Sequence, residues 1–265
     1  MDDYAPHARF YDLEHADYQD DLALYAGFAE VARHLPHPRN RRDVLELACG
    51  SGRILLPLAA MGVSVTGLDT SPAMLALARQ KAADAGNAAL TRRVHLIEGD
   101  MRDFHLGRTF GLVIVGLNSL MHLQTQEEQL ATLRAAARHL DPDGRLVVDL
   151  FNPEVALPDQ HQEGQLFLHC LKTLPDGAHL LHYQSPRVDR AAQLIHMANY
   201  YDEILADATV KRHLAPFTLR YVTRGELQAM AAAAGLTLAA LYGTYELDPY
   251  EADSPRLLAV LERPD

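Results

Sequence analysis

The residues best suited to chemistry lie in and around Val44–Arg53, where a short apolar run leads into the turn ACGSG. A buried strand that breaks into a glycine-rich turn and then a helix brings bare backbone close to a ligand at the helix N-terminus. Glu46 stands just before this turn, and Asp69 closes the next apolar segment, VSVTGLD. Two acids that bracket the turn favour a ligand with an ammonium group and a ribose over one with a pyrophosphate.

Further polar residues follow later apolar segments. Asp100 comes after Val94–Glu98, and Asn118 and His122 come after Leu112–Val115. Because ligands bind at the carboxyl edge of open α/β sheets, we expect these side chains near the turn. A histidine there could remove a proton from an attacking hydroxyl or amine. The alternative is that His122 packs between a helix and the sheet and bonds a carbonyl.

Strands alternate with helices along the middle of the chain. Expected strands are Asp43–Leu47, Val63–Leu68, Val94–Glu98, Leu112–Val115 and Arg145–Phe151. Ser71-Pro72 and Thr125-Gln126-Glu127-Glu128 begin two helices between them, and Asp141-Pro142-Asp143-Gly144 predicts a turn into the last strand. Strands separated by helices predict a doubly wound, Rossmann-like α/β fold.

The pattern changes after Asn152-Pro153. Extended segments predict an antiparallel insertion of three or four strands at Gln165–Lys172, Ala178–Ser185, Gln193–Ile204 and Phe217–Tyr221. A capping box at 223–226 begins a helix, and Leu236–Tyr242 and Leu257–Leu261 predict a closing hairpin that completes a seven-stranded mixed sheet. The expected units are a helical lid (1–40), a cofactor-binding core (41–152), the insertion (153–222) and the closing helix and hairpin (223–265).

Composition limits the partners. Lys and Arg number 24 against 35 Asp and Glu, a net charge of −11 at pH 7, so we expect no nucleic acid partner. No apolar run approaches the ~20 residues that span a membrane, and the acidic, aromatic start is unlike a signal peptide. The 2 cysteines suggest no disulfide framework and the 14 histidines no metal-ligand spacing, which favours a cytoplasmic protein without a metal.

Ordered motifs together resemble the class I S-adenosylmethionine-dependent methyltransferases of the small-molecule type. The motifs are ELACGSG, VTGLDTSPAMLALAR, LIEGDMRDF, and GLVIVGLNSLMHL ahead of GRLVVDLFNP. The resemblance implies methyl transfer from S-adenosyl-L-methionine to a nitrogen or oxygen of a small-molecule acceptor. The implied cofactor-binding residues are Tyr11, Glu46, Ala48, Gly50, Gly52, Asp69, Thr70, Asp100, Met101, Leu117 and Asn118.

The resemblance also implies roles for these residues. Gly50 and Gly52 admit the methionine part of the cofactor, because a Cβ would collide there, and Glu46 helps to hold its amino end. Asp69 accepts hydrogen bonds from the ribose hydroxyls, and Asp100 contacts the adenine amino group. Met101 offers its backbone N–H and side chain to the ring, and backbone near Leu117 and Asn118 caps the cofactor amino group.

Several assignments stay open at this level. Asp103 could replace Asp100 as the adenine contact, Ala48 stands where the family usually has glycine, and Arg53 stands at the usual third glycine. His122 faces the reaction centre in the family and is the candidate base. Many such enzymes need no base, however, because alignment against the electrophilic sulfonium supplies much of the rate.

Segments outside the core suggest how the acceptor is enclosed. Tyr11-Asp12 resembles the aromatic lid of similar methyltransferases, and the insertion either covers the substrate or forms the surface of a homodimer. Tyr183, Tyr200 and Arg220 are candidate acceptor contacts, and each is otherwise a structural residue of the insertion sheet.

Other classes fit less well. A nicotinamide dehydrogenase needs a third glycine where this chain has Leu55. A DNA amino-methyltransferase usually carries Asn or Asp followed by Pro-Pro after the fourth strand, whereas this chain has Asn118-Ser119-Leu120. A non-catalytic S-adenosylmethionine-binding or interaction module is the remaining alternative.

Overall fold

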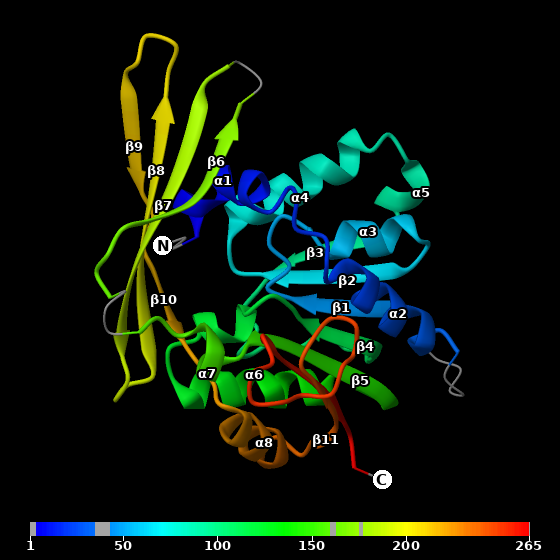
Figure 1. The fold of residues 1–265 in the computed structure, drawn as a ribbon. Helices are drawn as coiled ribbons and strands as arrows, with labels where there is room; N and C mark the ends of the chain where they lie inside the picture. The colour runs from blue at the N-terminus through cyan, green and yellow to red at the C-terminus, as the bar shows by residue number, and fades with distance from the viewer. Residues whose placement is uncertain (1–3, 35–42, 160–162, 175–176, 265) are drawn as a thin grey trace.

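The computed structural model describes residues 4–34, 43–159, 163–174 and 177–264. Its main body is a twisted sheet flanked by helices, and a second, smaller sheet stands across from the carboxyl ends of β1 and β2 (Figure 1). Within the described ranges, no helix combines the length and hydrophobicity needed to cross a membrane.

The main sheet has seven strands in the order β11-β12-β5-β4-β1-β2-β3. They are β1 (Asp43–Leu47), β2 (Ser64–Asp69), β3 (Val94–Glu98), β4 (Phe110–Val115), β5 (Leu140–Phe151), β11 (Thr237–Tyr242) and β12 (Arg256–Glu262). β1 to β5 pair in parallel, whereas β12 is antiparallel to both neighbours. The predicted doubly wound, mixed sheet is confirmed, and its order reverses between β1 and β4, where such sheets bind ligands.

β5 starts earlier than the sequence predicted. Its ladder with β4 is interrupted, because Phe110 lies opposite Leu140 while Leu112 lies opposite Arg145. The four intervening residues, 141–144, therefore bulge out of the ladder, and they belong to the strand rather than to the turn that the sequence predicted ahead of it.

Helices pack on both faces of the main sheet. One apolar cluster includes residues of α2 (Leu22–Ala32), α3 (Leu55–Ala60), α4 (Pro72–Asp84) and α5 (Ala88–Thr91), and another includes residues of α6 (Gln126–Arg138) and α8 (Arg224–Ala233). Two short helices follow strand ends, η1 (Ser119–His122) and α7 (Pro153–Ala156). The side chains of Ser71, Thr125 and Thr223 each accept a hydrogen bond from the backbone N–H three residues on, which confirms the predicted N-caps.

The insertion is a five-stranded antiparallel sheet, one strand larger than the upper expectation. Its strands are β6 (Phe167–Thr173), β7 (His179–Asp189), β8 (Leu194–Ile204), β9 (Val210–Leu214) and β10 (Phe217–Arg220). The missed strand, β9, has the sequence VKRHL and pairs only with the end of β8. A mostly polar edge strand lacks the apolar alternation that marks a half-buried strand.

Helix α1 (Ala5–Glu14) joins the two sheets. On the core side, the Asp12 carboxylate accepts hydrogen bonds from Ser51 and Lys81. On the insertion side, Phe10 stacks on Tyr201, with ring centroids 4.1 Å apart. In the predicted lid 1–40, only α1 is in this position, because α2 packs against the main sheet; residues 35–40 lie outside the described ranges.

Candidate active site

A cavity of about 1740 Å³ lies between the carboxyl edge of the main sheet, α1 and the insertion sheet. Most of the sequence-predicted site residues line it: Tyr11, Ala48, Gly50, Asp69, Thr70, Asp100, Met101, Leu117, Asn118 and His122. Glu46, Gly52, Tyr183, Tyr200 and Arg220 do not. The fold thus gathers residues from four separate motifs around one space.

The turn after β1 places backbone directly at the cavity wall. Gly50 has a φ of +53°, and a Cβ there would stand 3.0 Å from the Met74 side chain. Its N–H donates to Oδ2 of Asp69 at 2.7 Å, and the Ser71 N–H donates to Oδ1 at 2.8 Å. The Asp69 carboxylate is thereby held at the end of β2 with its orientation set by backbone donors. Ala48 also has a positive φ, of 56°, although it is not a glycine.

Glu46 lies behind this turn. It is buried, and its Oε2 has no hydrogen-bond partner within the part of the chain that the structure describes. Burial raises the pKa of Glu46 to about 8, partly opposed by the Arg53 guanidinium. Arg53 itself makes two hydrogen bonds to Asp21, at 2.8 and 2.5 Å, so the residue at the usual third glycine ties the turn to the segment before α2.

Asp100 sits at the far end of the cavity with Arg102 and Glu128. Arg102 Nε lies 2.9 Å from both carboxylate oxygens of Asp100 and its guanidinium also bonds Glu128. This contact holds the pKa of the Asp100 carboxyl below its usual range. The Asp103 side chain is 97% exposed and does not line the cavity, which favours Asp100 as the acid that a ligand would meet.

Leu117 and Asn118 follow β4 with positive φ values of 43° and 64°. A buried carboxylate that the sequence analysis missed holds them. Asp149 on β5 is fully buried, and the Leu117 N–H donates to its Oδ2 at 3.2 Å while the Asn118 N–H donates to its backbone oxygen at 2.9 Å. The only signal in the sequence is an acid inside the apolar strand LVVDLF.

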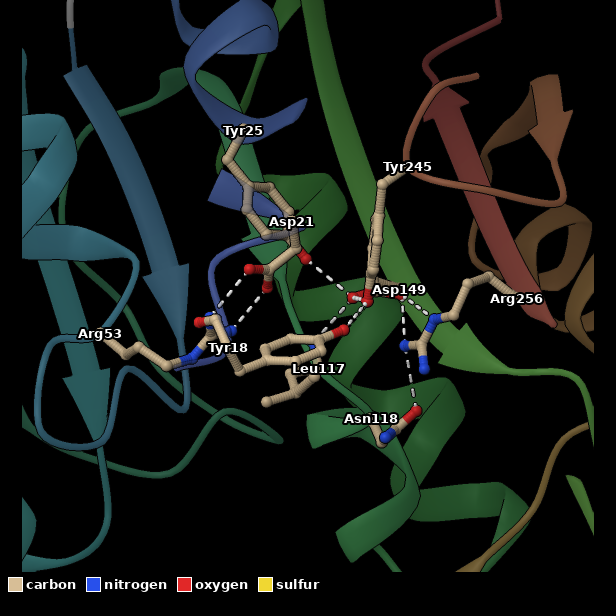
Figure 2. Close-up of polar contacts among 9 residues, drawn as sticks. All are labelled: Tyr18, Asp21, Tyr25, Arg53, Leu117, Asn118, Asp149, Tyr245 and Arg256. Atoms are coloured by element: carbon tan, nitrogen blue, oxygen red, sulfur yellow. Dashed lines mark hydrogen bonds and ion pairs between the residues drawn. The ribbon is translucent and has the colours of Figure 1, made fainter. Parts of the chain in front are cut away.

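Three more side chains converge on Asp149 (Figure 2). The hydroxyls of Tyr25 and Tyr245 donate to Oδ2 at 2.9 and 3.1 Å, and Arg256 Nε donates to Oδ1 at 3.0 Å. Arg256 also donates to the Asn118 side chain at 3.3 Å and lines the cavity. Residues from α2, β12 and the loop before it therefore fix the backbone at the cavity edge.

Aromatic rings and imidazoles form the part of the cavity nearest His122. The His122 ring lies 5.5 Å from that of Tyr4 and 5.6 Å from that of Phe217, centroid to centroid. Burial lowers the pKa of His122 to about 4. His122 therefore borders the cavity as a neutral imidazole at neutral pH, not as a helix–sheet packing residue.

The insertion sheet contributes a polar wall. His182 Nδ1 lies 2.5 Å from Glu14 Oε1, and Tyr201 donates to the same oxygen at 3.0 Å. His182 Nε2 lies 3.0 Å from Asn199 Oδ1, and all four residues line the cavity. Sequence reasoning missed these residues because the segments that contain them carry no motif.

The candidate acceptor contacts from the insertion need correction. Tyr183 lies opposite Tyr200 across β7 and β8, one residue away from the His182–Tyr201 pair that faces α1. Successive side chains of a strand point to opposite faces, so both tyrosines point away from the cavity. Arg220 is buried and bonds Gln129 and Glu226 instead.

No cluster of three or more His, Cys, Asp or Glu side chains suited to a metal ion occurs within the described ranges. The residues that line the cavity fit an adenosyl sulfonium ligand. Gly50 has no Cβ to occupy the space at the turn, and the carboxylates of Asp69 and Asp100 lie after β2 and β3.

Comparison with known proteins identifies the family. A model described as a methyltransferase domain matches residues 44–144. The cypemycin N-terminal methyltransferase of a Streptomyces species is 32% identical over 235 residues, which span 89% of this chain and 88% of that enzyme. The chain belongs to the S-adenosylmethionine-dependent methyltransferases. The resemblance in the motifs and the expected small-molecule type are thereby confirmed.

Solved structures agree with this assignment. The CcbJ methyltransferase from Streptomyces caelestis superposes on this methyltransferase with a TM-score of 0.76 at 28% identity, covering 93% of this chain and 91% of that one. An amino pentose methyltransferase from Micromonospora echinaspora, solved with S-adenosylmethionine bound, has a TM-score of 0.71 at 25% identity and 95% coverage of each chain. The predicted enzyme class and cofactor are confirmed.

Replacement of Asp149 tests its role in holding the site. Asp149→Asn should lower the free energy of unfolding by about 3–5 kcal/mol, because Arg256 would be left as a buried, unpaired charge. Urea denaturation measures this loss. The double variant Asp149→Leu/Arg256→Met should recover part of this loss, since it removes both charges but leaves the Tyr25 and Tyr245 hydroxyls without their acceptor. An equal loss in the single and double variants would contradict the assignment.

Proposed function

We propose that this methyltransferase methylates the nitrogen of a small amine. The observation that carries the proposal is the group of rings around His122, namely Tyr4, Phe217 and the His7 imidazole, which are uncharged at neutral pH. Such a pocket disfavours an ammonium ion and so favours the uncharged amine, which is the nucleophile. The names of two similar proteins support an amine acceptor, since one is a cypemycin N-terminal methyltransferase and the other an amino pentose methyltransferase.

Bound S-adenosylmethionine supplies an electrophilic methyl group on its sulfonium. In the proposal, Asp69 binds the ribose hydroxyls, because its carboxylate is already oriented by two backbone donors. Asp100 and Met101 receive the adenine ring, and the open turn at Gly50 receives the methionine part. The remaining assigned residues surround these contacts: Tyr11, Glu46, Ala48, Gly52, Thr70, Leu117 and Asn118.

In this proposal, His122 raises the rate by aligning the acceptor rather than by acting as a strong base. A group with a pKa of about 4 is a weak base at neutral pH. Its neutral ring can accept a hydrogen bond from the acceptor and fix the direction of attack, while α1 and the insertion exclude water. Acceptor contacts are assigned to the inward-facing residues of the insertion, among them His182, Gln184 and Asn199.

The acceptor proposal is tested with an amino pentose and the matching sugar that has a hydroxyl in place of the amine. With a ¹³C-labelled methyl group on the donor, we expect an N-methyl signal from the first and no product from the second. The acid limb of kcat/KM should follow the amine, with no inflection from His122 above its pKa of about 4. Equal methylation of the hydroxyl sugar would reject the proposal.

The ribose assignment is tested by calorimetry. Asp69→Ala should weaken S-adenosylmethionine binding by about tenfold or more, because two charge-assisted hydrogen bonds are lost. Asp103→Ala is the matched control, since the Asp103 side chain is 97% exposed and lies outside the cavity. Unchanged affinity in Asp69→Ala would contradict the ribose role.

We also propose a cellular location and a class of partner for this protein. Both cysteines are free, which supports a reducing cytoplasm, and the charge of −11 supports a small-molecule partner over a nucleic acid. The insertion serves two purposes in this proposal. Its inner face covers the acceptor, and its outer face joins a second copy of the chain.

The outer face carries the homodimer proposal. Leu168, Tyr183, Tyr200 and Leu214 lie in one row across four strands, and the Asp202–Arg212 ion pair stands in a neighbouring row. Leu168 and Leu214 are 54% and 57% exposed. An exposed apolar patch that also carries both signs of charge is able to pair with itself about a twofold axis.

Sedimentation velocity tests the dimer. Leu168→Glu should convert a dimeric wild type to monomer, because a charge would be buried without a partner. Met61→Glu is the control: Met61 is 52% exposed but follows α3, away from the insertion. A wild type that stays monomeric at every concentration would reject the interface.

A further inference from the structure

His7 is a buried, titratable group that the assignments above leave unused. It lies on α1 with 3% of its surface exposed and lines the cavity. Its Nε2 has no hydrogen-bond partner among the described residues, whereas the ring makes a hydrogen bond with the backbone at Pro216. Buried polar atoms are nearly always paired, so an unpaired one indicates strain or a partner that arrives with a ligand.

The hydrogen bond at Pro216 assigns the protonation of the ring. The carbonyl oxygen can only accept, and Nε2 is unpaired, so the donor is Nδ1–H. A neutral imidazole with hydrogen on Nδ1 carries its lone pair on Nε2. A backbone carbonyl that holds one nitrogen and leaves the other free is the arrangement of an oriented base.

The neighbours of His7 place it in the pocket of His122. The His7 ring lies 4.8 Å from the Tyr4 ring and 5.5 Å from the Phe217 ring, and both of these rings also contact His122. His7 and His122 thus border the same small space, one from α1 and one from η1.

We propose that Nε2 of His7 is the group that takes the proton from the acceptor amine; this rests on the amine acceptor proposed above. The nitrogen lone pair forms the new bond to the methyl carbon as the carbon–sulfur bond breaks and its electron pair stays on sulfur. As positive charge develops on the nitrogen, one of its N–H protons passes to Nε2, which leaves a neutral N-methyl amine and an imidazolium. Reopening of the site returns this proton to solvent.

The groups around His7 determine its pKa and therefore whether it can accept this proton. Burial lowers the pKa of His7, and His182 on β7 acts in the same direction, whereas Glu14 on α1 raises it. His122 on η1 is neutral at neutral pH. His7 is therefore an unprotonated base when the acceptor binds, and Glu14 stabilises the imidazolium that forms.

NMR of the full chain with ¹⁵N-labelled histidine tests the assignment without turnover. The probe is sinefungin, an S-adenosylmethionine analogue with an amine at the position of the transferred methyl group. We expect His7 to show the Nδ1–H tautomer, and its Nε2 signal to shift towards the protonated form when sinefungin binds. The exposed His34, at the end of α2, should not respond.

Kinetics of His7→Gln supply the second arm. Glutamine can accept a hydrogen bond but takes up no proton, so single-turnover methylation of the amino pentose should fall on the order of 10²-fold. S-adenosylmethionine affinity should change less than about twofold by this argument. The His34→Gln control should keep the wild-type single-turnover rate.

The outcomes separate the two proposals. A sinefungin-dependent His7 shift without methylation of any amine would reject the amine acceptor and still support His7 as the proton acceptor. A His7 signal that does not change when sinefungin binds, or a His7→Gln variant with the wild-type single-turnover rate, would overturn the His7 assignment.

Discussion

The buried charge of Asp149 is the constraint on which the site depends. A carboxylate with no exposed surface is stable only where hydrogen bonds replace its hydration. The donors are the backbone of Leu117, the hydroxyls of Tyr25 and Tyr245, and the guanidinium of Arg256. These donors come from α2, the loop after β4 and the closing hairpin, which therefore meet at the switch point of the sheet (Figure 2).

The enclosure of the site depends on a second polar junction, at α1. Asp12 bonds the turn after β1 through Ser51, and Glu14 binds His182 and Tyr201 of the insertion. A helix held from both sides closes the cavity over its contents. The same helix carries His7 into the pocket, so the contacts that hold α1 over the cavity also place the proposed base.

The fold was largely predictable because its signals are local. Alternating strands and helices, and the N-caps at Ser71, Thr125 and Thr223, are set by side chains within a few residues of each element. β9 was not predicted because an exposed edge strand of mostly polar residues has no alternation of apolar and polar residues. The predicted start of β5 was wrong because the residues that are typical of a turn are also found in a bulge within a strand.

By itself, the sequence determined the edge of the cavity to which we assign the cofactor: the turn at Gly50, and Asp69 and Asp100 after their strands. These positions follow from the strand–turn–helix units that contain them. Only the tertiary structure decided the acceptor side. One residue of register in β7 turns His182 inward and Tyr183 outward, and Asp149 finds its donors up to 124 residues away. Long-range packing, which no local pattern records, selects those partners, and among the residues that the structure describes it leaves Nε2 of His7 without one.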